Sequence, residues 1–154
     1  MQTTAWRVVH SVLSSGQQTA GSITAGLLSL TAGGGISITT SSASQLQATN
    51  ATAGDITYAS TVGFTILSIT NTVGAVTVTT PGTMTISGNL TSGANAMTLT
   101  STGSTFSQAG GTTITAGTLS VNGVGGYTLQ NLAITGLQAT NASTGAVTLI
   151  ATTP

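Results

Sequence analysis

The sequence predicts an all-β fold, a right-handed parallel β-helix (β-solenoid) whose coils are about 20 residues long. Three observations support this fold class. A motif recurs along the chain, apolar and polar residues alternate with a period of two inside each copy, and glycine and asparagine separate the copies. Units this short cannot bury an apolar face alone, so each must stack on the next.

The clearest copies of the motif share the pattern Leu-x-x-Thr-Asn, a short stretch containing Gly, and then Ile or Val followed by Thr. They occupy residues 46–57, 67–77 and 137–148. Shorter copies of the second half of the motif fill the intervals at 35–39, 95–100, 111–115 and 126–129. At about 20 residues a coil the chain makes about seven or eight coils.

Alternation within the copies indicates β-strands rather than helices. Val76 and Val78 alternate with Thr77 and Thr79, and residues 97–100 repeat the pattern. Side chains of a strand point to opposite faces in turn, and branched residues fit a pleated surface. Because crossovers between parallel strands are nearly always right-handed, we expect a right-handed coil.

Aligning the three full copies predicts which side chains point inward. The predicted inward positions are Leu46, Ala48 and Asn50, then Leu67, Ile69 and Asn71, and finally Leu137, Ala139 and Asn141. The apolar members should form the core, so a charge at Leu67 should prevent folding. Asparagines at one corner of successive coils can form a hydrogen-bonded ladder, and Asn50 and Asn71 are the pair expected to touch.

Two regions are predicted along the chain. Residues 1–20 carry no copy of the repeat and are expected to form a cap or a docking strand, while residues 21–154 form the solenoid. The first region holds the only tryptophan and the only arginine, Trp6 and Arg7. The chain stops inside a repeat unit, so we expect its coils to continue end to end into another copy or into the rest of a longer polypeptide.

Composition excludes several classes of function. The 154 residues include one basic residue, one acidic residue and no cysteine, against a usual charged fraction of about 25%. Nucleic-acid binding needs several Lys or Arg to neutralise phosphates, so no nucleic-acid partner is expected. No run of about 20 apolar residues is present, so no transmembrane helix is expected. Without cysteine, neither disulfides nor thiolate metal sites can form.

We expect no enzyme, no catalytic residue, no cofactor and no metal site. General acid–base catalysis needs titratable groups held close together, and the candidates are Asp55, His10 and Arg7. Asp55 stands where the sister copies have alanine, which is typical of a solvated turn residue. Calcium needs several carboxylates, and the chain has one. The triplets at Asn50, Asn89 and Asn141 match the glycosylation consensus, as a chain rich in Asn, Ser and Thr does by chance.

The repeat units resemble the haemagglutinin-type repeats of filamentous haemagglutinin and related giant bacterial exoproteins and adhesins. The resemblance covers about residues 21–154 and rests on the Leu-x-x-Thr-Asn…Gly-x-Val-Thr units. It implies a right-handed β-helix, an extracellular or cell-surface location, and a role in adhesion, surface display or fibre formation, with a host or environmental surface as a further partner. The chain lacks the recognisable secretion domain with which that family begins.

Two functional hypotheses follow. The first is a structural or adhesive module of an extracellular fibre or cell-surface adhesin. The alternative is an ice-binding solenoid, because outward threonines could form a flat face of hydroxyl and methyl groups. The threonines concerned are Thr57, Thr77, Thr79, Thr98, Thr100 and Thr148. Threonine is also the ordinary solvent-facing residue of a strand. Assembly state separates the first hypothesis from the second.

Overall fold

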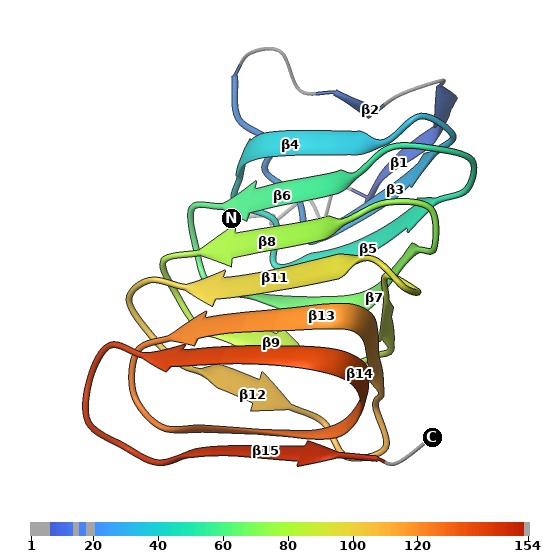
Figure 1. Ribbon diagram of the computed structural model, residues 1–154. Helices are drawn as coiled ribbons and strands as arrows, with labels where there is room; N and C mark the ends of the chain where they lie inside the picture. The colour runs from blue at the N-terminus through green and yellow to red at the C-terminus, as the bar shows by residue number, and fades with distance from the viewer. Residues whose placement is uncertain (1–6, 14–15, 18–20, 153–154) are drawn as a thin grey trace, which may run out of the picture.

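The computed structural model of the chain is a parallel β-solenoid, which confirms the predicted fold class (Figure 1). The structure describes residues 7–13, 16–17 and 21–152. These residues form strands and turns, with no helix among them. The strands belong to one continuous hydrogen-bonded sheet that winds around a central core.

Fifteen strands make up the sheet. The first eight are β1 (Arg7–Leu13), β2 (Gly16–Gln17), β3 (Leu27–Ala32), β4 (Ile36–Ser41), β5 (Gln45–Asn50), β6 (Ile56–Ser60), β7 (Phe64–Asn71) and β8 (Val76–Thr80). The others are β9 (Met84–Ile86), β10 (Leu90–Thr91), β11 (Ala96–Ser101), β12 (Phe106–Gln108), β13 (Ile114–Gly123), β14 (Tyr127–Asn141) and β15 (Val147–Ala151).

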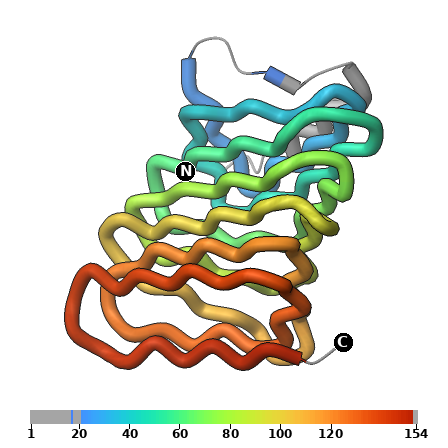
Figure 2. Tube along the Cα trace, viewed as in Figure 1, coloured from blue at the N-terminus to red at the C-terminus, as the bar shows by residue number. Residues whose placement is uncertain are grey.

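The coil is flattened into two faces. The front face of Figure 1 holds β4, β6, β8 and β11, followed by the second halves of β13 and β14. The rear face holds β3, β5, β7, β10 and the first halves of β13 and β14, with the shorter β9, β12 and β15 beside them. Front strands run from right to left, rear strands run back, and later coils lie lower, so the coil is right-handed (Figures 1 and 2).

Every strand pair is parallel, and like positions stack on like positions. On the front face one column runs through Ile36, Ile56, Val76, Met97, Leu119 and Leu137. Successive members are 18 to 22 residues apart, which reproduces the irregular spacing of the sequence repeat. The stack has about 6 turns, fewer than the spacing predicts, because the coils at both ends are incomplete within the described residues.

The core consists of the inward side chains of both faces. Along β6 and β8 buried and less buried residues alternate strictly, as the period-two pattern predicts. One column on the rear face runs through Leu30, Ala48, Ile69, Leu90, Ile114 and Leu132, all of them buried. Stacked about 4.8 Å apart, these aliphatic side chains exclude water from the core.

The predicted position of Leu67 is wrong. Ile66 is fully buried and stacks on Leu46, whereas Leu67 is half-buried and lies at a register shift in β7. β7 carries one extra residue at this point, where the rear face bends, and Ser68 then pairs with Gln47. The alternation therefore resumes one residue later, and Ile69 and Asn71 return to the expected inward columns.

The third full copy of the motif is half a coil out of phase with the other two. Residues 46–50 lie on the rear face, whereas residues 137–141 lie on the front face and pair with residues 119–123. Leu137 does point inward, but Asn141 lies in line with Gly123 instead of with the asparagines of the other corner. Both faces have the same in-and-out alternation, so the motif Leu-x-Ala-x-Asn fits either of them.

The N-terminal segment contributes strands to the same stack. β1 pairs in parallel with β3, and β2 pairs in parallel with β4. The segment predicted to form a cap or docking strand thus contributes β1 to the rear face and β2 to the front face. The rest of that segment, including Trp6, lies outside the described residues.

Substitutions around the bend in β7 test the assigned phase. Ile66→Ala removes a fully buried side chain and should lower the free energy of unfolding by about 2–5 kcal/mol. Leu67→Ala should cost less because Leu67 is half-buried, and the outward Thr65→Ala should stay within about 0.5 kcal/mol. Denaturant titration followed by far-ultraviolet circular dichroism measures all three. If Leu67→Ala lowered the free energy of unfolding more than Ile66→Ala did, Leu67 would be the inward residue, as the sequence predicts.

Candidate functional site

An asparagine ladder supports the corner that leads from the rear face to the front face. Asn50 Nδ2 donates to Asn71 Oδ1 at 3.2 Å, as predicted, and to the carbonyl oxygens of Ala53 and Gly54, both at 2.8 Å. Asn50 Oδ1 accepts from the backbone N–H of Gly35 at 3.0 Å. Both asparagines are buried, so their amide groups replace water as partners for the turn backbone.

From Asn50 onward the length of this corner changes with the residue in the ladder column. At the start of the column, Ala32 is followed by the turn 33–35, and the Gly35 N–H of that turn is bonded to Asn50. The column runs through Ala32, Asn50, Asn71, Ser92, Ala116 and Ile134. Beyond the asparagines the chain makes the turns 51–55 and 72–75, and beyond Ser92 it makes the shorter turn 93–95. At Ala116 the corner contains no turn, and β13 continues from the rear face onto the front face without a break. A polar side chain in the column is thus paired with a turn whose carbonyl groups it satisfies.

A second buried ladder, formed by hydroxyl groups, lines the opposite corner. Ser60 Oγ donates to the carbonyl of Ser41 in the coil before it, at 3.1 Å, and accepts from the N–H of Val62. Thr80 repeats this arrangement one coil on, donating to the carbonyl of Val62 at 2.6 Å and accepting from Gly82. The ladder comprises Ser41, Ser60, Thr80 and Ser101, all buried. This ladder was not predicted from the sequence, although a serine or threonine ends each of the front strands β4, β6, β8 and β11.

Aromatic rings pack beside the hydroxyl ladder. Tyr58 is buried and donates its hydroxyl to Ser41 Oγ at 3.0 Å, and its ring lies 5.1 Å from that of Phe64. Burial raises the pKa of Tyr58, and its hydrogen bonds to serine hydroxyls oppose that shift. Further on, the rings of Phe106 and Tyr127 are 5.2 Å apart. Beside these two rings, the position that holds a serine or threonine in the hydroxyl ladder is occupied by Gly123, because a Cβ at this position would lie 2.8 Å from the Tyr127 ring.

A shallow groove follows from the change in corner length. Its volume is about 300 Å³, and its lining is mainly apolar. The turn 93–95 overhangs it, and Ala116, Gly117 and Ile134 contribute to its lining below. A Cβ at Gly117 would collide with the carbonyl oxygen of Ala94, so glycine is required where the straight strand passes under the turn. No titratable side chain lines the groove.

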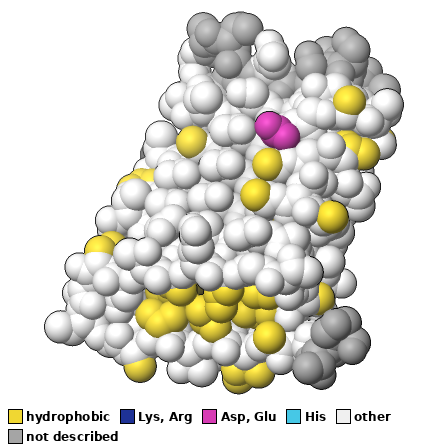
Figure 3. Space-filling model, in the orientation of Figure 1, with side chains coloured by type: hydrophobic (Ala, Val, Ile, Leu, Met, Phe, Trp, Pro, Cys, Tyr) yellow, Lys and Arg dark blue, Asp and Glu magenta, His cyan; other side chains and the backbone are white. Residues whose placement is uncertain are grey.

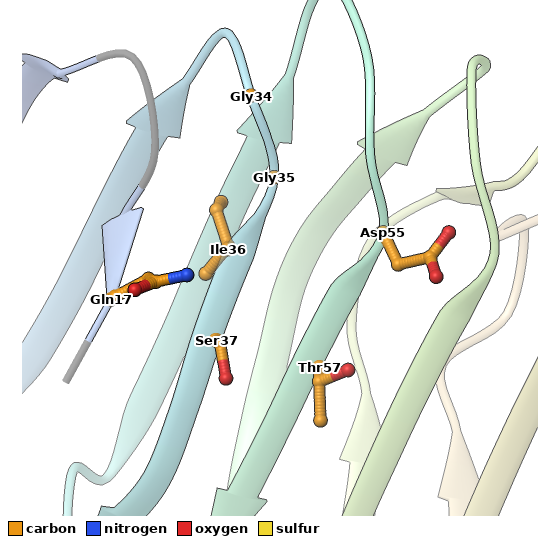
Figure 4. Close-up of a pocket in the computed structure, with 7 residues that line it drawn as sticks. All are labelled: Gln17, Gly34, Gly35, Ile36, Ser37, Asp55 and Thr57. Atoms are coloured by element: carbon orange, nitrogen blue, oxygen red, sulfur yellow. The ribbon is translucent and has the colours of Figure 1, made fainter. Parts of the chain in front are cut away.

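Asp55 borders a second hollow of about 200 Å³, beside Gly35 and Ser37 (Figure 4). Its Oδ1 accepts from the backbone N–H of Ala75 at 2.8 Å, so the carboxylate supports the next turn. Figure 4 shows the carboxylate pointing away from Gln17 and Ser37.

Within the described part of the chain no three His, Cys, Asp or Glu residues come together as a set of metal ligands. His10 and Arg7 lie in β1, whose side chains are outside the described part of the structure.

In the last coil, inward side chains are exposed within the described part of the chain. Leu137 stacks on Leu119 in the central column, yet it is 45% exposed whereas Leu119 is fully buried. Ala139, which stacks on the buried Val121, is also exposed. Figure 3 shows a contiguous group of apolar atoms at the level of the last coils, whereas those higher on the same face are scattered. We call the edge formed by residues 136–141 and β15 the open end.

The front face is covered by small uncharged side chains. One outward column runs through Ser37, Thr57, Thr77, Thr98, Ser120 and Gln138. A second column contains Thr79, Thr100 and Asn122. The rear face has a similar column of Thr31, Thr49, Thr70, Thr91 and Thr115. Thr148, grouped with the front threonines by sequence, lies on the rear face in β15.

The three consensus glycosylation triplets differ in accessibility. Asn50 is 2% exposed and its amide is bonded within the ladder, so an enzyme cannot reach it in the folded chain. Asn141 is half-buried and donates to the carbonyl of Gly145. Asn89 is exposed, and its Oδ1 accepts from the N–H of Thr113.

Comparisons with known proteins give no relative: no protein-family model, curated protein or solved structure matches the chain. No helix capable of crossing a membrane was found among the residues that the structure describes.

Removing one member of the asparagine ladder tests its structural role. Asn71→Ala deletes the donor to the carbonyl of Ala75 and the acceptor for Asn50 Nδ2, and it should cost at least about 1–3 kcal/mol of unfolding free energy. Thr70→Ala, on the exposed side of the same strand, is the matched control and should stay within about 0.5 kcal/mol. Equal urea midpoints for the two variants would show that the ladder contributes nothing.

Proposed function

We propose that the chain is a structural or adhesive β-solenoid module of an extracellular fibre or cell-surface adhesin, and that it stacks end to end. The observation that carries this proposal is the open end. There the central column reaches the surface with Leu137 45% exposed, and the backbone edge beside it carries no charge. The likeness of the repeat units to haemagglutinin-type repeats supports the same class of function.

Stacking at the open end would repeat the contact that each coil already makes with the next. Leu119 and Leu129 are fully buried because a further coil covers them. Leu137 and Leu149, which stack on these two residues, lack that cover among the described residues. Burying a leucine side chain stabilises by about 1.5–3 kcal/mol, so a coil placed there gains free energy from both residues.

We further propose that the module acts without catalysis. Asp55 is the only acidic residue of the chain, and its carboxylate is bonded to the backbone of the next turn. The described tyrosines, Tyr58 and Tyr127, are buried in the core beside other rings. A rod whose surface carries almost no charge suits a role in spacing or display.

Assembly state tests the proposed function. Sedimentation velocity over a range of concentrations should show species larger than one chain of 14.9 kDa, and electron micrographs should show rods that lengthen with concentration. Association should persist in high salt, because one acidic and one basic residue leave little electrostatic attraction to screen. A stable monomer at every concentration would contradict end-to-end stacking.

Ice binding is the second candidate, and the registered front columns favour it. Thr77 and Thr79 lie directly above Thr98 and Thr100, so four threonines form a small rectangular array about 4.8 Å by about 6.7 Å. Elsewhere on the front face Ser120, Gln138 and Asn122 interrupt the threonines. The rear face carries its own aligned threonine column, so alignment is a general property of this coil.

We therefore expect no thermal hysteresis when ice crystals grow in a solution of the folded protein. Nanolitre osmometry at micromolar concentration measures it, with Thr77→Tyr on the front face and Thr70→Tyr on the rear face as paired variants. If thermal hysteresis were observed, and if Thr77→Tyr abolished it while Thr70→Tyr did not, ice binding would replace the structural role as the favoured function.

A further inference from the structure

We propose that Asn89 is the acceptor for an N-linked glycan, attached to its side-chain nitrogen on the rear face of the solenoid. This site goes beyond the proposed structural role and rests on it only in requiring that the chain pass through a secretory compartment. Three features carry the assignment: the consensus triplet at residues 89–91, its outward phase, and the hydrogen bond that orients the Asn89 amide.

The triplet lies where the rear face bends into β10. Leu90 is fully buried and stacks between Ile69 and Ile114 in the aliphatic column of the core. Residues on either side of an inward residue point outward, so Asn89 and Thr91 face solvent together. Asn89 is exposed and Thr91 is half-buried. The amide and the hydroxyl that the consensus requires therefore lie on one accessible surface.

A hydrogen bond to the next coil orients the Asn89 amide. Its Oδ1 accepts from the N–H of Thr113 at 2.9 Å, and the N–H of Leu90 donates to the carbonyl of Thr113 at 3.0 Å. Because a backbone N–H can bond only to the oxygen of an amide side chain, this contact fixes which way the amide faces. Nδ2, the atom to which a glycan is attached, has no hydrogen-bond partner among the described residues.

The other two consensus triplets lack these features. Asn50 points inward, and its Nδ2 donates to Asn71 and to two turn carbonyl groups, so a glycan there would replace the ladder and enter the core. Asn141 uses both ends of its amide: Nδ2 donates to the carbonyl of Gly145 and Oδ1 accepts from the N–H of Ser143. Of the three asparagines, only Asn89 combines an exposed side chain with an unbonded nitrogen.

Attachment of the glycan is a glycosyl transfer. The donor is a lipid-linked oligosaccharide diphosphate, and the bond between the anomeric carbon of the sugar and the diphosphate oxygen breaks. Asn89 Nδ2 forms a new bond to that carbon and gives up one proton to the transferring enzyme, while the lipid diphosphate leaves. Oδ1 keeps its lone pairs, so the hydrogen bond from the N–H of Thr113 survives the modification.

A glycan at Asn89 is compatible with the rest of the fold. It projects from the side of a middle coil, in which β10 pairs with β7 and with β13, so it disturbs no contact between coils. The outward column beside it consists of Thr70, Thr91 and Thr115, which are uncharged hydroxyl residues. In a chain with one acidic and one basic residue, hydrated carbohydrate supplies solubility that charge supplies in other proteins.

Secretion from a glycosylating eukaryotic cell tests the site. The chain, directed into the secretory pathway by an added leader, should gain the mass of one glycan. Peptide N-glycosidase in heavy-oxygen water should then convert Asn89 to a labelled aspartate. Thr91→Val should abolish the glycan, because it removes the hydroxyl that the consensus requires while keeping the shape of an outward strand residue. Thr91→Ser and Asn141→Gln should both retain it.

Circular dichroism and melting temperature verify folding, and Thr91→Val should change neither because it leaves the bond between Asn89 and Thr113 in place. A folded, secreted chain without a glycan would overturn the assignment, as would a glycan mainly on Asn50 or Asn141, or one that Thr91→Val retains. These results leave end-to-end stacking untouched. Stacking is measured on chain made without glycan, and a monomer there would contradict the stacking proposal while Asn89 remained the acceptor.

Discussion

Parallel, in-register stacking of one coil on the next is the interaction on which the rest of this structure depends. Register brings every side chain directly over its counterpart about 4.8 Å away. Neighbours in a column therefore tend to be alike: aliphatic in the core, amide or hydroxyl beside the turn carbonyls, and mostly hydroxyl on the outer faces. The near absence of charge is consistent with this geometry, because like charges stacked at such a distance repel.

The two buried ladders explain how the coil turns its corners without leaving backbone groups unsatisfied. Asn50 and Asn71 supply amide hydrogens to the carbonyl groups of the turns that follow them. Ser60 and Thr80 bond instead to the carbonyl of the previous coil and to an N–H of their own turn. No buried side-chain nitrogen or oxygen among the described residues lacks a partner. The ladders thus bind coil to coil at both sides of the aliphatic core.

The fold class and one ladder contact could be predicted from the sequence because both depend on local periodicity. Within a strand, the alternation shows which side chains point inward and which point outward. The Thr-Asn pair shared by two copies of the motif places Asn50 and Asn71 at equivalent positions of neighbouring coils, where they form a hydrogen bond. Leu67 was misplaced because an extra residue at the bend resets the alternation, and nothing in the motif marks the bend. Asn141 was misplaced because the two faces accept the same pattern. The sequence predicted that the coils continue end to end, but it could not predict the exposure of Leu137, because exposure depends on what covers that side chain.

The unequal corners have a consequence for how such a chain can change. Turns 51–55, 72–75 and 93–95 differ in length, and at Gly117 the turn vanishes, while the columns on either side keep their register. Length is therefore decoupled from core packing at this corner. Residues added or deleted there alter the outline of the rod and leave its interior unchanged. The edge is suited to carrying grafted recognition loops, spaced along the axis at the pitch of the coil.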